Sequence, residues 1–261
     1  MTEKIIVEQN GAILRIIFNQ PEKRNAVSLE MWEAVETALT KYAPDPSVRV
    51  LIMSGAGGKA FVSGADISKF ESERSSAEAV EYYNSTTTRV YDMVEAFPKP
   101  TIAQINGFCV GGGVALSVCC DIRICGEGSA FAIPAARLGL GYGFPGINRL
   151  ANLVGPAFTK EIFFTARRYN SDEVLRMGLV NHVVQDEKVA ATAEEMASQI
   201  IGNAPMTVDA VKFIANQTRM DESQRNLRAC DDMVQACFDS ADYIEGRRAF
   251  MEKRKPVWQG R

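Results

Sequence analysis

The most restrictive feature of this sequence is an uncharged stretch, residues 100–120, that includes three consecutive glycines at 111–113. A membrane-spanning helix needs about 20 apolar residues, so the length of the stretch alone would allow one. Pro100, Asn106 and the glycines do not suit such a helix, because proline removes a backbone donor and glycine is a poor helix former. We therefore predict a buried strand, a glycine-rich turn and a short helix here, and no membrane as a partner.

Strand-like and helix-like patterns alternate on both sides of that stretch. Asn10-Gly11 separates two runs of alternating apolar residues, which predicts a β-hairpin. Ser28 is a suitable N-cap for a helix that stops before Pro44. The predicted strands are residues 4–9, 12–18, 48–53, 101–105 and 121–126, and the predicted helices are residues 29–43, 76–96 and 114–120. This alternation favours a parallel α/β arrangement up to about residue 185.

The chain beyond residue 186 has helical patterns only. They lie near residues 186–202, 205–218, 222–239 and 242–253. Basic residues are concentrated at the end of this region. Residues 247–261 hold six Arg or Lys and the single acid Glu252, whereas the whole chain has a net charge of −3. We therefore predict an all-helical C-terminal region that ends in a basic segment.

Composition and charge restrict the class of protein and its partners. With 261 residues, 46% apolar and 23% charged, the chain matches a folded globular protein of one or two domains. A net charge of −3 argues against nucleic acid, whose binding depends on a basic surplus. Six cysteines without CxxC spacing and the single His182 offer no zinc cluster. We expect a small-molecule ligand and no metal.

The N-terminal segment gives an expectation about the compartment. MTEKIIVEQNG contains charged residues and lacks the apolar region of a secretory signal. Together with the cysteine spacing, this predicts free thiols and a cytoplasmic protein.

Two strand-to-helix loops carry the features that predict chemistry. NGFCVGGG leads directly into a helix, and its glycines let backbone N–H groups face a ligand at the positive end of the helix dipole. The alternative explanation of these glycines is close packing of helix on strand. AFVSGADISKF, residues 60–70, is a second such passage. Two N–H donors from separate loops, directed at one carbonyl oxygen, would form an oxyanion hole.

Two further motifs are weaker indications. Gly141–Gly146 matches the G-x-G-x-x-G dinucleotide fingerprint, but that fingerprint follows the first strand of a βαβ unit, whereas here it lies in mid-chain. We do not expect nicotinamide binding. His182 lies in the strand-like run GLVNHVV, which favours a structural or edge histidine, so a histidine-based catalytic triad would lack its base.

The ordered motifs along the chain resemble those of the crotonase superfamily, which has the enoyl-CoA hydratase/isomerase fold. They are QPEKRNAV at 20–27, KAFVSGADI at 59–67, INGFCVGGG at 105–113, CDIRIC at 120–125, GLVNHVV at 178–184 and FMEKRKP at 250–256. The resemblance implies an α/β core of ββα spiral turns that binds acyl-CoA, residues 1–200. It also implies a helical C-terminal trimerisation region, residues 201–261, and assembly as a trimer or a dimer of trimers.

The resemblance also implies roles for particular residues. The N–H groups of Ala65 and Gly112 would bind the thioester carbonyl of an acyl-CoA and stabilise an enolate. No separate cofactor is implied, because coenzyme A is part of the substrate. The coenzyme A nucleotide would contact Lys23, Arg24, Ala26, Ser63, Asp66 and Ile67 of the core, and Phe250 and Lys253 of the helical tail of the same or a neighbouring subunit.

The sequence departs from the family pattern at the positions that transfer protons. Ala115 and Ala135 stand where the hydratases of the family have two glutamates, and an alanine methyl cannot take or give a proton. Gly143 stands where some related isomerases and dehalogenases have a carboxylate, and Tyr142 stands where the methylmalonyl-CoA decarboxylases have a tyrosine. Three functions stay open: an acyl-CoA enzyme of the hydratase/isomerase family, a decarboxylase-like lyase that uses Tyr142, and a non-catalytic acyl-CoA binder.

Overall fold

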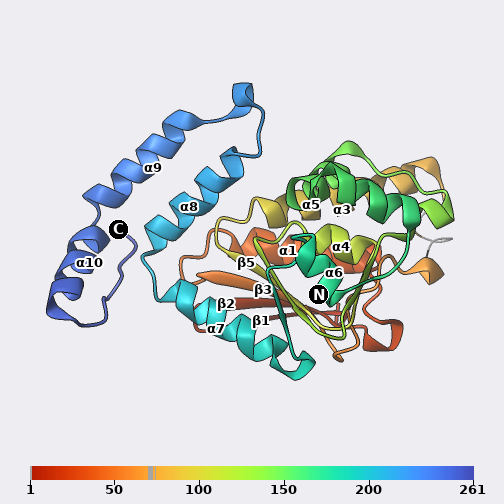
Figure 1. The fold of residues 1–261 in the computed structure, drawn as a ribbon, viewed down its shortest axis with the longest axis horizontal. Coiled ribbons are helices and arrows are strands. Elements are labelled where there is room, and N and C mark those ends of the chain that lie inside the picture. Colours follow the sequence, from red (N-terminus) through yellow and green to blue (C-terminus); the bar gives the residue numbers. More distant parts are fainter. Residues whose placement is uncertain (1, 70–72, 74) are drawn as a thin grey trace.

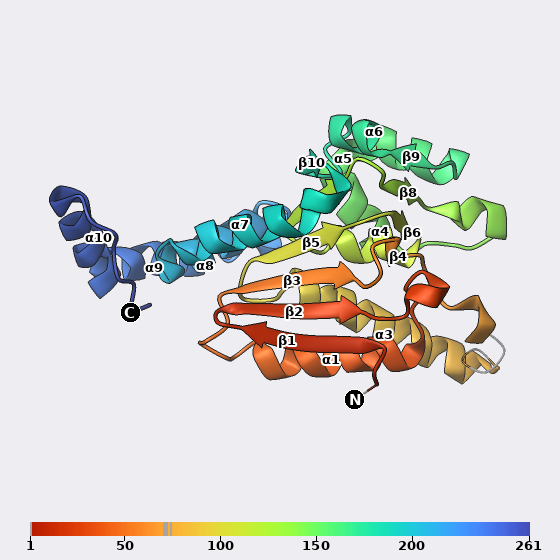
Figure 2. The same cartoon turned by 90° about the horizontal axis from the view of Figure 1, so that it is seen from below.

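The computed structural model of the chain describes residues 2–69, 73 and 75–261. These residues form two β-sheets with helices around them (Figures 1 and 2). The six-stranded sheet has the order β1 (Ile5–Asn10), β2 (Ile13–Phe18), β3 (Val50–Gly55), β5 (Thr101–Ile105), β7 (Ile122–Gly126) and β10 (His182–Val184). The four-stranded sheet has the order β4 (Ala60–Val62), β6 (Phe108–Val110), β8 (Ala130–Ala132) and β9 (Tyr169–Asn170).

Helices follow the strands along the chain. Those of the core are α1 (Leu29–Tyr42), α3 (Ala77–Glu95), α4 (Gly112–Ser117), α5 (Phe144–Thr165), α6 (Ser171–Arg176) and α7 (Val189–Ile201). The C-terminal helices are α8 (Pro205–Gln217), α9 (Leu227–Asp239) and α10 (Ala241–Glu252). The predicted class, an α/β core followed by helices alone, agrees with this order.

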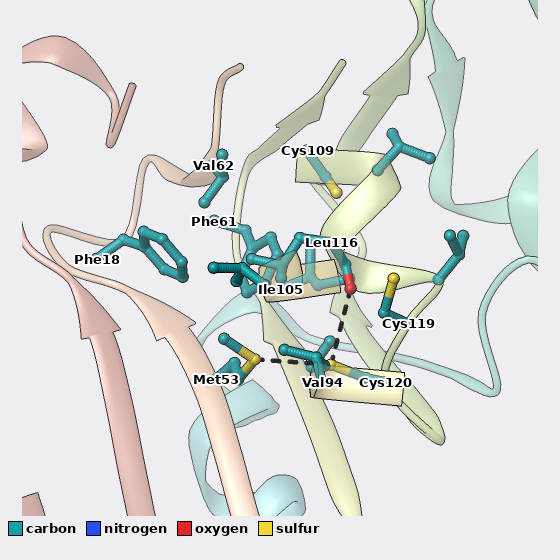
Figure 3. Close-up of a cluster of buried hydrophobic side chains, with 14 of the residues drawn as sticks. Phe18, Met53, Phe61, Val62, Val94, Ile105, Cys109, Leu116, Cys119 and Cys120 are labelled. Carbon is teal, nitrogen blue, oxygen red and sulfur yellow. Dashed lines mark hydrogen bonds between the residues drawn. The ribbon is translucent and has the colours of Figure 1, made fainter. Parts of the chain in front are cut away.

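The six-stranded sheet is covered on both faces, which explains its apolar strands. β1 and β2 form the predicted antiparallel hairpin, with Gly11 at a positive φ of 57° in the turn, and the strands from β2 to β10 pair in parallel. On one face, Val189 and Ala193 of α7 belong to a buried cluster with Ile52, Ile102 and Ile124. The larger cluster on the other face includes Phe18, Phe61, Leu116 and Cys120 (Figure 3).

Several predicted boundaries differ from the structure, among them that of β3, which was predicted at residues 48–53. The segment that we predicted as a turn between residues 106 and 113 contains β6, whose residues pair in parallel with β4 and β8. α4 begins at Gly112, earlier than the predicted residue 114, because the last two glycines already have helical conformation. α9 begins at Leu227, after a short 3-10 turn at Glu222–Gln224, rather than at residue 222.

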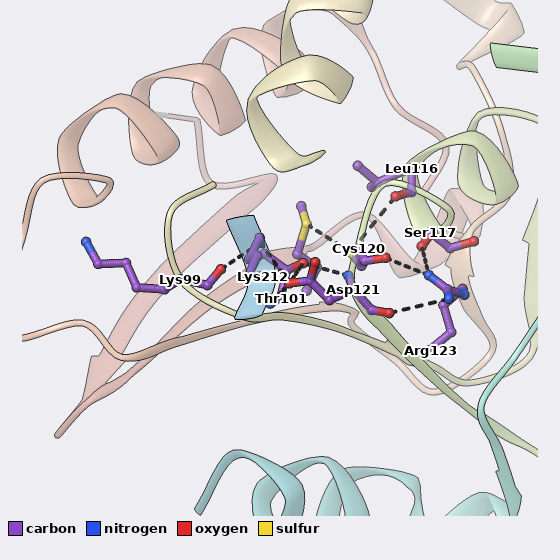
Figure 4. A network of polar contacts seen from close by, with 9 residues as sticks. Lys99, Thr101, Leu116, Ser117, Cys120, Asp121, Arg123 and Lys212 are labelled. Atoms are coloured by element: carbon purple, nitrogen blue, oxygen red, sulfur yellow. Dashed lines mark hydrogen bonds and ion pairs between the residues drawn. The ribbon is translucent and has the colours of Figure 1, made fainter. Parts of the chain in front are cut away.

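The C-terminal helices extend away from the two sheets (Figures 1 and 2). α8 is joined to the core by Lys212, whose Nζ donates to Asp121 Oδ2 at 2.7 Å and to the carbonyl of Lys99 at 2.9 Å (Figure 4). α8, α9 and α10 line an open apolar cavity of about 630 Å³. The chain end folds back over α10, where the Asp242 carboxylate accepts the N–H groups of Gln259 and Gly260.

Other global predictions can be compared with the described residues. All six cysteines are free thiols, as predicted. None of the described helices combines the length and the apolar character that a membrane span requires. Within the same residues, the His, Cys, Asp and Glu side chains form no group of three or more that could hold a metal ion.

Candidate active site

Two loops meet at the candidate active site because the strands before them are neighbours. β4 and β6 pair in parallel, so the loop after β4 and the loop after β6 leave the same edge of the four-stranded sheet. A Cβ placed on Gly111 or Gly112 would lie 4.0 Å and 3.9 Å, respectively, from the Cα of Gly64. The two loops predicted from sequence therefore lie close together, separated by about the width of one methyl group.

The first loop leaves the N–H of Ala65 free. Val27 donates its N–H to Gly64 O at 2.8 Å, and Asp66 donates its N–H to Val27 O at 2.9 Å. In such a parallel bridge the N–H of the middle residue points away from the partner strand. The N–H of Ala65 donates no hydrogen bond to any described residue.

The second loop leaves the N–H of Gly112 free. Gly111, at φ 54°, is the N-cap of α4 and donates its own N–H to Ala132 O at 2.8 Å. The first N–H groups of a helix have no acceptor within it, and that of Gly112 has none elsewhere in the described chain. Gly113 has a different role, because a Cβ there would lie 2.1 Å from Val62 O. Close packing of helix on strand therefore explains Gly113, and an N–H available to a ligand explains Gly112.

A charged network holds the first loop. The buried carboxylate of Asp66 accepts hydrogen bonds from Lys23 Nζ at 2.8 Å and from Ser68 Oγ at 2.6 Å. Burial tends to raise the pKa of Asp66, but the hydrogen bonds from Lys23, Ser68 and Gln20 outweigh it and lower this pKa to about 2. The Lys23 ammonium is therefore already paired with a carboxylate.

The other predicted nucleotide-binding residues lie next to this network. The Arg24 guanidinium is 4.9 Å from the centre of the Phe108 ring. Ala26 donates its N–H to Lys23 O at 3.1 Å, and Ser63 Oγ donates to the same carbonyl at 3.4 Å. Ile67 follows Asp66 and is 68% exposed.

Asn25 fixes the position of this segment and was not predicted from sequence. It is fully buried, at φ 56°. Its side chain accepts the N–H of Gln20 at 2.9 Å and donates to Ala56 O at 3.0 Å and Ala60 O at 2.7 Å. Asparagine tolerates positive φ better than most residues, which is the one signal that the sequence offered.

Further predicted site residues include two alanines and a tyrosine. Ala115 is half-buried on α4, and Ala135, in the 3-10 turn Pro134–Leu138, is 4% exposed in the main core. Tyr142 precedes Gly143, the N-cap of α5, and its ring lies edge-on to Phe163 at 4.9 Å. Burial raises the pKa of Tyr142.

Tyr91 is the second tyrosine, and sequence analysis missed it. Its ring lies edge-on to Trp32 at 5.4 Å, and its hydroxyl donates to Gly112 O at 3.4 Å. Burial raises the pKa of Tyr91 well above its ordinary value, and Tyr142 is one of the groups near enough to raise it further. No spacing in the sequence relates α3 to the glycine loop, so only the tertiary structure brings Tyr91 there.

Comparisons with known proteins agree with this architecture. A sequence profile of the enoyl-CoA hydratase/isomerase family matches residues 8–261. The chain belongs to that family. It is 38% identical to a crotonyl-CoA hydratase of Syntrophomonas wolfei over 97% of this chain and 96% of that protein. It is 35% identical to a carnitinyl-CoA dehydratase of Salmonella typhi over 100% of both chains.

A solved structure gives the same result for the fold. An enoyl-CoA hydratase/carnithine racemase of Magnetospirillum magneticum superposes with a TM-score of 0.93 at 35% identity, over 100% of this chain and 97% of the other. The predicted crotonase-like fold and superfamily are therefore confirmed, and this family member belongs to a family of enzymes.

Other predicted residues lie away from the two loops. Phe250 of α10 is 83% exposed, and Lys253 follows α10 at φ 54°. Figures 1 and 2 show that α10 lies far from α4 within one chain. The fingerprint-like segment at 141–146 follows a 3-10 turn rather than a strand. His182 is exposed on the edge strand β10, as expected for an edge histidine.

Proposed function

We propose that this family member binds an acyl-CoA thioester and stabilises its enolate with the N–H groups of Ala65 and Gly112. The observation that carries the proposal is that two neighbouring loops each leave one backbone N–H without an acceptor among the described residues. Preorganised N–H donors are most effective where negative charge develops, and removing one donor typically costs about 2.7–4 kcal/mol of activation free energy. The names of the relatives, crotonyl-CoA hydratase and carnitinyl-CoA dehydratase, support a thioester of this class.

Two segments form the proposed nucleotide-binding surface. They supply Lys23, Arg24 and Ala26, and Ser63, Asp66 and Ile67. Since Lys23 is paired with Asp66, we assign it to shaping this surface rather than to neutralising a phosphate. The Arg24 side chain has no carboxylate partner among the described residues, so it is the cation that we assign to the phosphates of coenzyme A.

The proposed chemistry uses no carboxylate at the two positions where the hydratases of the family have glutamates. Ala115 and Ala135 carry no titratable group, so neither can activate or protonate a water molecule. Stabilisation and protonation of an enolate, rather than removal of its α-proton, are therefore the steps that this site supports best.

The proline variant Gly112→Pro tests the oxyanion hole. Proline is well suited to the first position of a helix, so the change removes the N–H and keeps the helix start. We expect turnover to fall by about 10²–10³. The assay is a panel of enoyl-, 3-enoyl-, methylmalonyl- and β-diketone CoA thioesters, with products identified by mass spectrometry.

The matched control is Gly112→Ala, which retains the N–H. The added Cβ would meet the Tyr91 hydroxyl at 3.3 Å, so we expect a moderate loss only. Turnover that survives the proline change would refute the oxyanion hole. Tight thioester binding by the wild-type protein without any product would instead support the non-catalytic binder.

A decarboxylase-like lyase is the second candidate, and Tyr142 favours it. The half-buried Tyr142 hydroxyl makes no hydrogen bond to the rest of the described chain. Loss of CO₂ from a malonyl-type thioester leaves its bonding electrons on the α-carbon, so the enolate forms without a base. We expect Tyr142→Phe to lower the turnover of methylmalonyl-CoA and to leave coenzyme A affinity nearly unchanged. Equal turnover of the variant and the wild type would end this candidate.

The exposed ends of α10 support a proposal about assembly. Phe250 lies in α10 and Lys253 directly follows it, and α10 lies away from α4 and the glycine loop of its own chain (Figures 1 and 2). We assign them to the coenzyme A site of a neighbouring subunit in a trimer or a dimer of trimers. Sedimentation velocity tests this assembly, and a monomer at assay concentration would contradict it.

A further inference from the structure

We propose that Tyr91 is a further catalytic residue of this site, and that its hydroxyl donates a proton to the α-carbon of the enolate. The inference rests on the proposed acyl-CoA function and adds the group that supplies the proton. It starts from a contact between α3 and the first residue of α4.

The Tyr91 hydroxyl lies beside the proposed oxyanion donor. Its oxygen is 3.4 Å from Gly112 O and 3.3 Å from the position of a Cβ on Gly112. A Cβ lies about 2.5 Å from the nitrogen of its own residue, so the hydroxyl lies within about 6 Å of the Gly112 nitrogen. A thioester oxygen bound at about 2.9 Å from that nitrogen would lie in the same small region as the hydroxyl, and the proposal is that the α-carbon then faces the hydroxyl.

The surroundings hold the Tyr91 ring but leave the hydroxyl available. The ring meets Trp32 edge-on, with centres 5.4 Å apart and an interplanar angle of 80°. The hydrogen bond to Gly112 O, at 3.4 Å, is longer than the usual 2.5–3.0 Å for an O–H···O bond. Since it is also the one hydrogen bond that this hydroxyl makes to the described chain, substrate can replace it at low energetic cost.

The protonation state of Tyr91 fits the role of an acid. Burial raises its pKa well above the ordinary value, and Tyr142, Cys119 and Tyr83 raise it further, while Arg149 lowers it in part. The phenol is therefore protonated at neutral pH and can give a proton but not take one. This role complements the alanines at positions 115 and 135, which can do neither.

The proposed step balances in protons and electrons. The electron pair of the enolate C=C bond forms a new C–H bond with the phenolic proton, and the thioester C=O is restored. The O–H bond of Tyr91 breaks, and water returns a proton to the phenolate. No oxidant, reductant or metal ion takes part.

The first experiment uses acetoacetyl-CoA as the probe and follows the ultraviolet absorbance of its enolate on the protein as pH rises. Loss of a nearby hydroxyl donor in Tyr91→Phe should raise the pH at which half of the bound probe is ionised by about one unit, a tenfold change in the equilibrium. The control Tyr82→Phe removes a hydroxyl from the same helix, where it donates to Glu33 at 2.9 Å, and should leave this pH unchanged.

The second experiment measures turnover of the thioester that the panel identifies. We expect Tyr91→Phe to lower kcat by about 10² or more and to change KM by less than about threefold. The ratio of the wild-type kcat to the variant kcat should stay constant across the neutral pH range, because the raised pKa keeps Tyr91 protonated there.

Two results would overturn the proposal. One is an unchanged ionisation of the probe together with an unchanged kcat. The other is a joint loss of probe binding and thermal stability in Tyr91→Phe, which would assign the residue to structure alone. A wild-type protein that never ionises acetoacetyl-CoA would contradict the proposed oxyanion hole rather than the role of Tyr91.

Discussion

The two loops that meet at the candidate site each leave a backbone N–H without an acceptor among the described residues, by different physical means. The loop that contains Ala65 is held by hydrogen bonds to Val27 and by the charged network around Asp66. The loop that contains Gly112 has no side chains in its glycine run, and its position is set by the fit of Gly113 against Val62 O. The first arrangement depends on ionisation, and the second depends on the absence of a Cβ. A change in pH should therefore affect one loop and not the other.

The largest expected effect is on the stability of the chain when the loop that contains Gly112 and Gly113 is changed. In Gly113→Ala the new Cβ would lie 2.1 Å from Val62 O, a backbone atom that cannot move without disturbing β4. We expect a loss of about 3 kcal/mol or more in the free energy of unfolding, at the upper end of overpacking effects. Thermal denaturation measures it as a fall of about 6–12 °C in Tm.

The control for that prediction is the neighbouring variant Gly112→Ala, whose Cβ has the Tyr91 hydroxyl at 3.3 Å as its nearest contact. We expect its Tm to fall much less. The loss in Gly113→Ala should be the same at pH 7 and pH 4. Equal Tm values for the two alanine variants would contradict the steric account.

A smaller, pH-dependent effect on stability is expected when the loop that contains Ala65 and Asp66 is changed. The pKa of Asp66 is lowered from 3.8 to about 2 in the folded chain, so ionisation of Asp66 stabilises the fold. This stabilisation is present above about pH 4 and is lost as the pH falls towards 2. At one pKa unit per 1.36 kcal/mol, Asp66→Asn should cost about 2 kcal/mol at pH 7.

Urea unfolding at several pH values between 7 and 3 tests this prediction. The stability curves of Asp66→Asn and the wild type should approach each other as the pH falls. Parallel curves over that range would contradict the role of Asp66 as the charged centre of the loop.

The smallest effect should come from the hydroxyl beside Asp66. Ser68 Oγ donates to Asp66 at 2.6 Å and accepts from Lys23 Nζ at 2.8 Å. We expect Ser68→Ala to cost about 1 kcal/mol, as for a typical net hydrogen bond. In a double-mutant cycle its effect should largely vanish in the Asp66→Asn background and should add to that of Gly113→Ala. Simple additivity with Asp66→Asn would contradict the network.

Sequence reasoning located many elements of the fold and missed others, among them β6 and the helices α5 and α6. The hairpin around Asn10-Gly11 and the strand β5 lie where local patterns predicted them. β6 was read as part of a turn because three residues, Phe108–Val110, carry too little periodicity. Its strand conformation comes from β4 and β8 on either side.

The candidate site likewise contains residues that the sequence predicted and residues that it did not. The motifs around Ala65 and Gly112 lie in adjacent loops in the structure, but their roles in binding a thioester stay predictions. Asn25 and Tyr91 could not be assigned from sequence, because a buried asparagine and a tyrosine on an amphipathic helix look like any other residue of their type. Their partners lie on other segments of the chain, more than twenty residues away for Ala56, Ala60 and Gly112.

The sequence by itself determined the α/β class with its all-helical C-terminal region, the family, and the absence of carboxylates at positions 115 and 135, because each follows from local residue types and their spacing. Only the tertiary structure decided that Gly113 is needed for packing while the N–H of Gly112 stays free, that Lys23 is neutralised by Asp66, and that a tyrosine of α3 lies beside the glycine loop. These depend on distances between segments far apart in the chain, which no local pattern encodes.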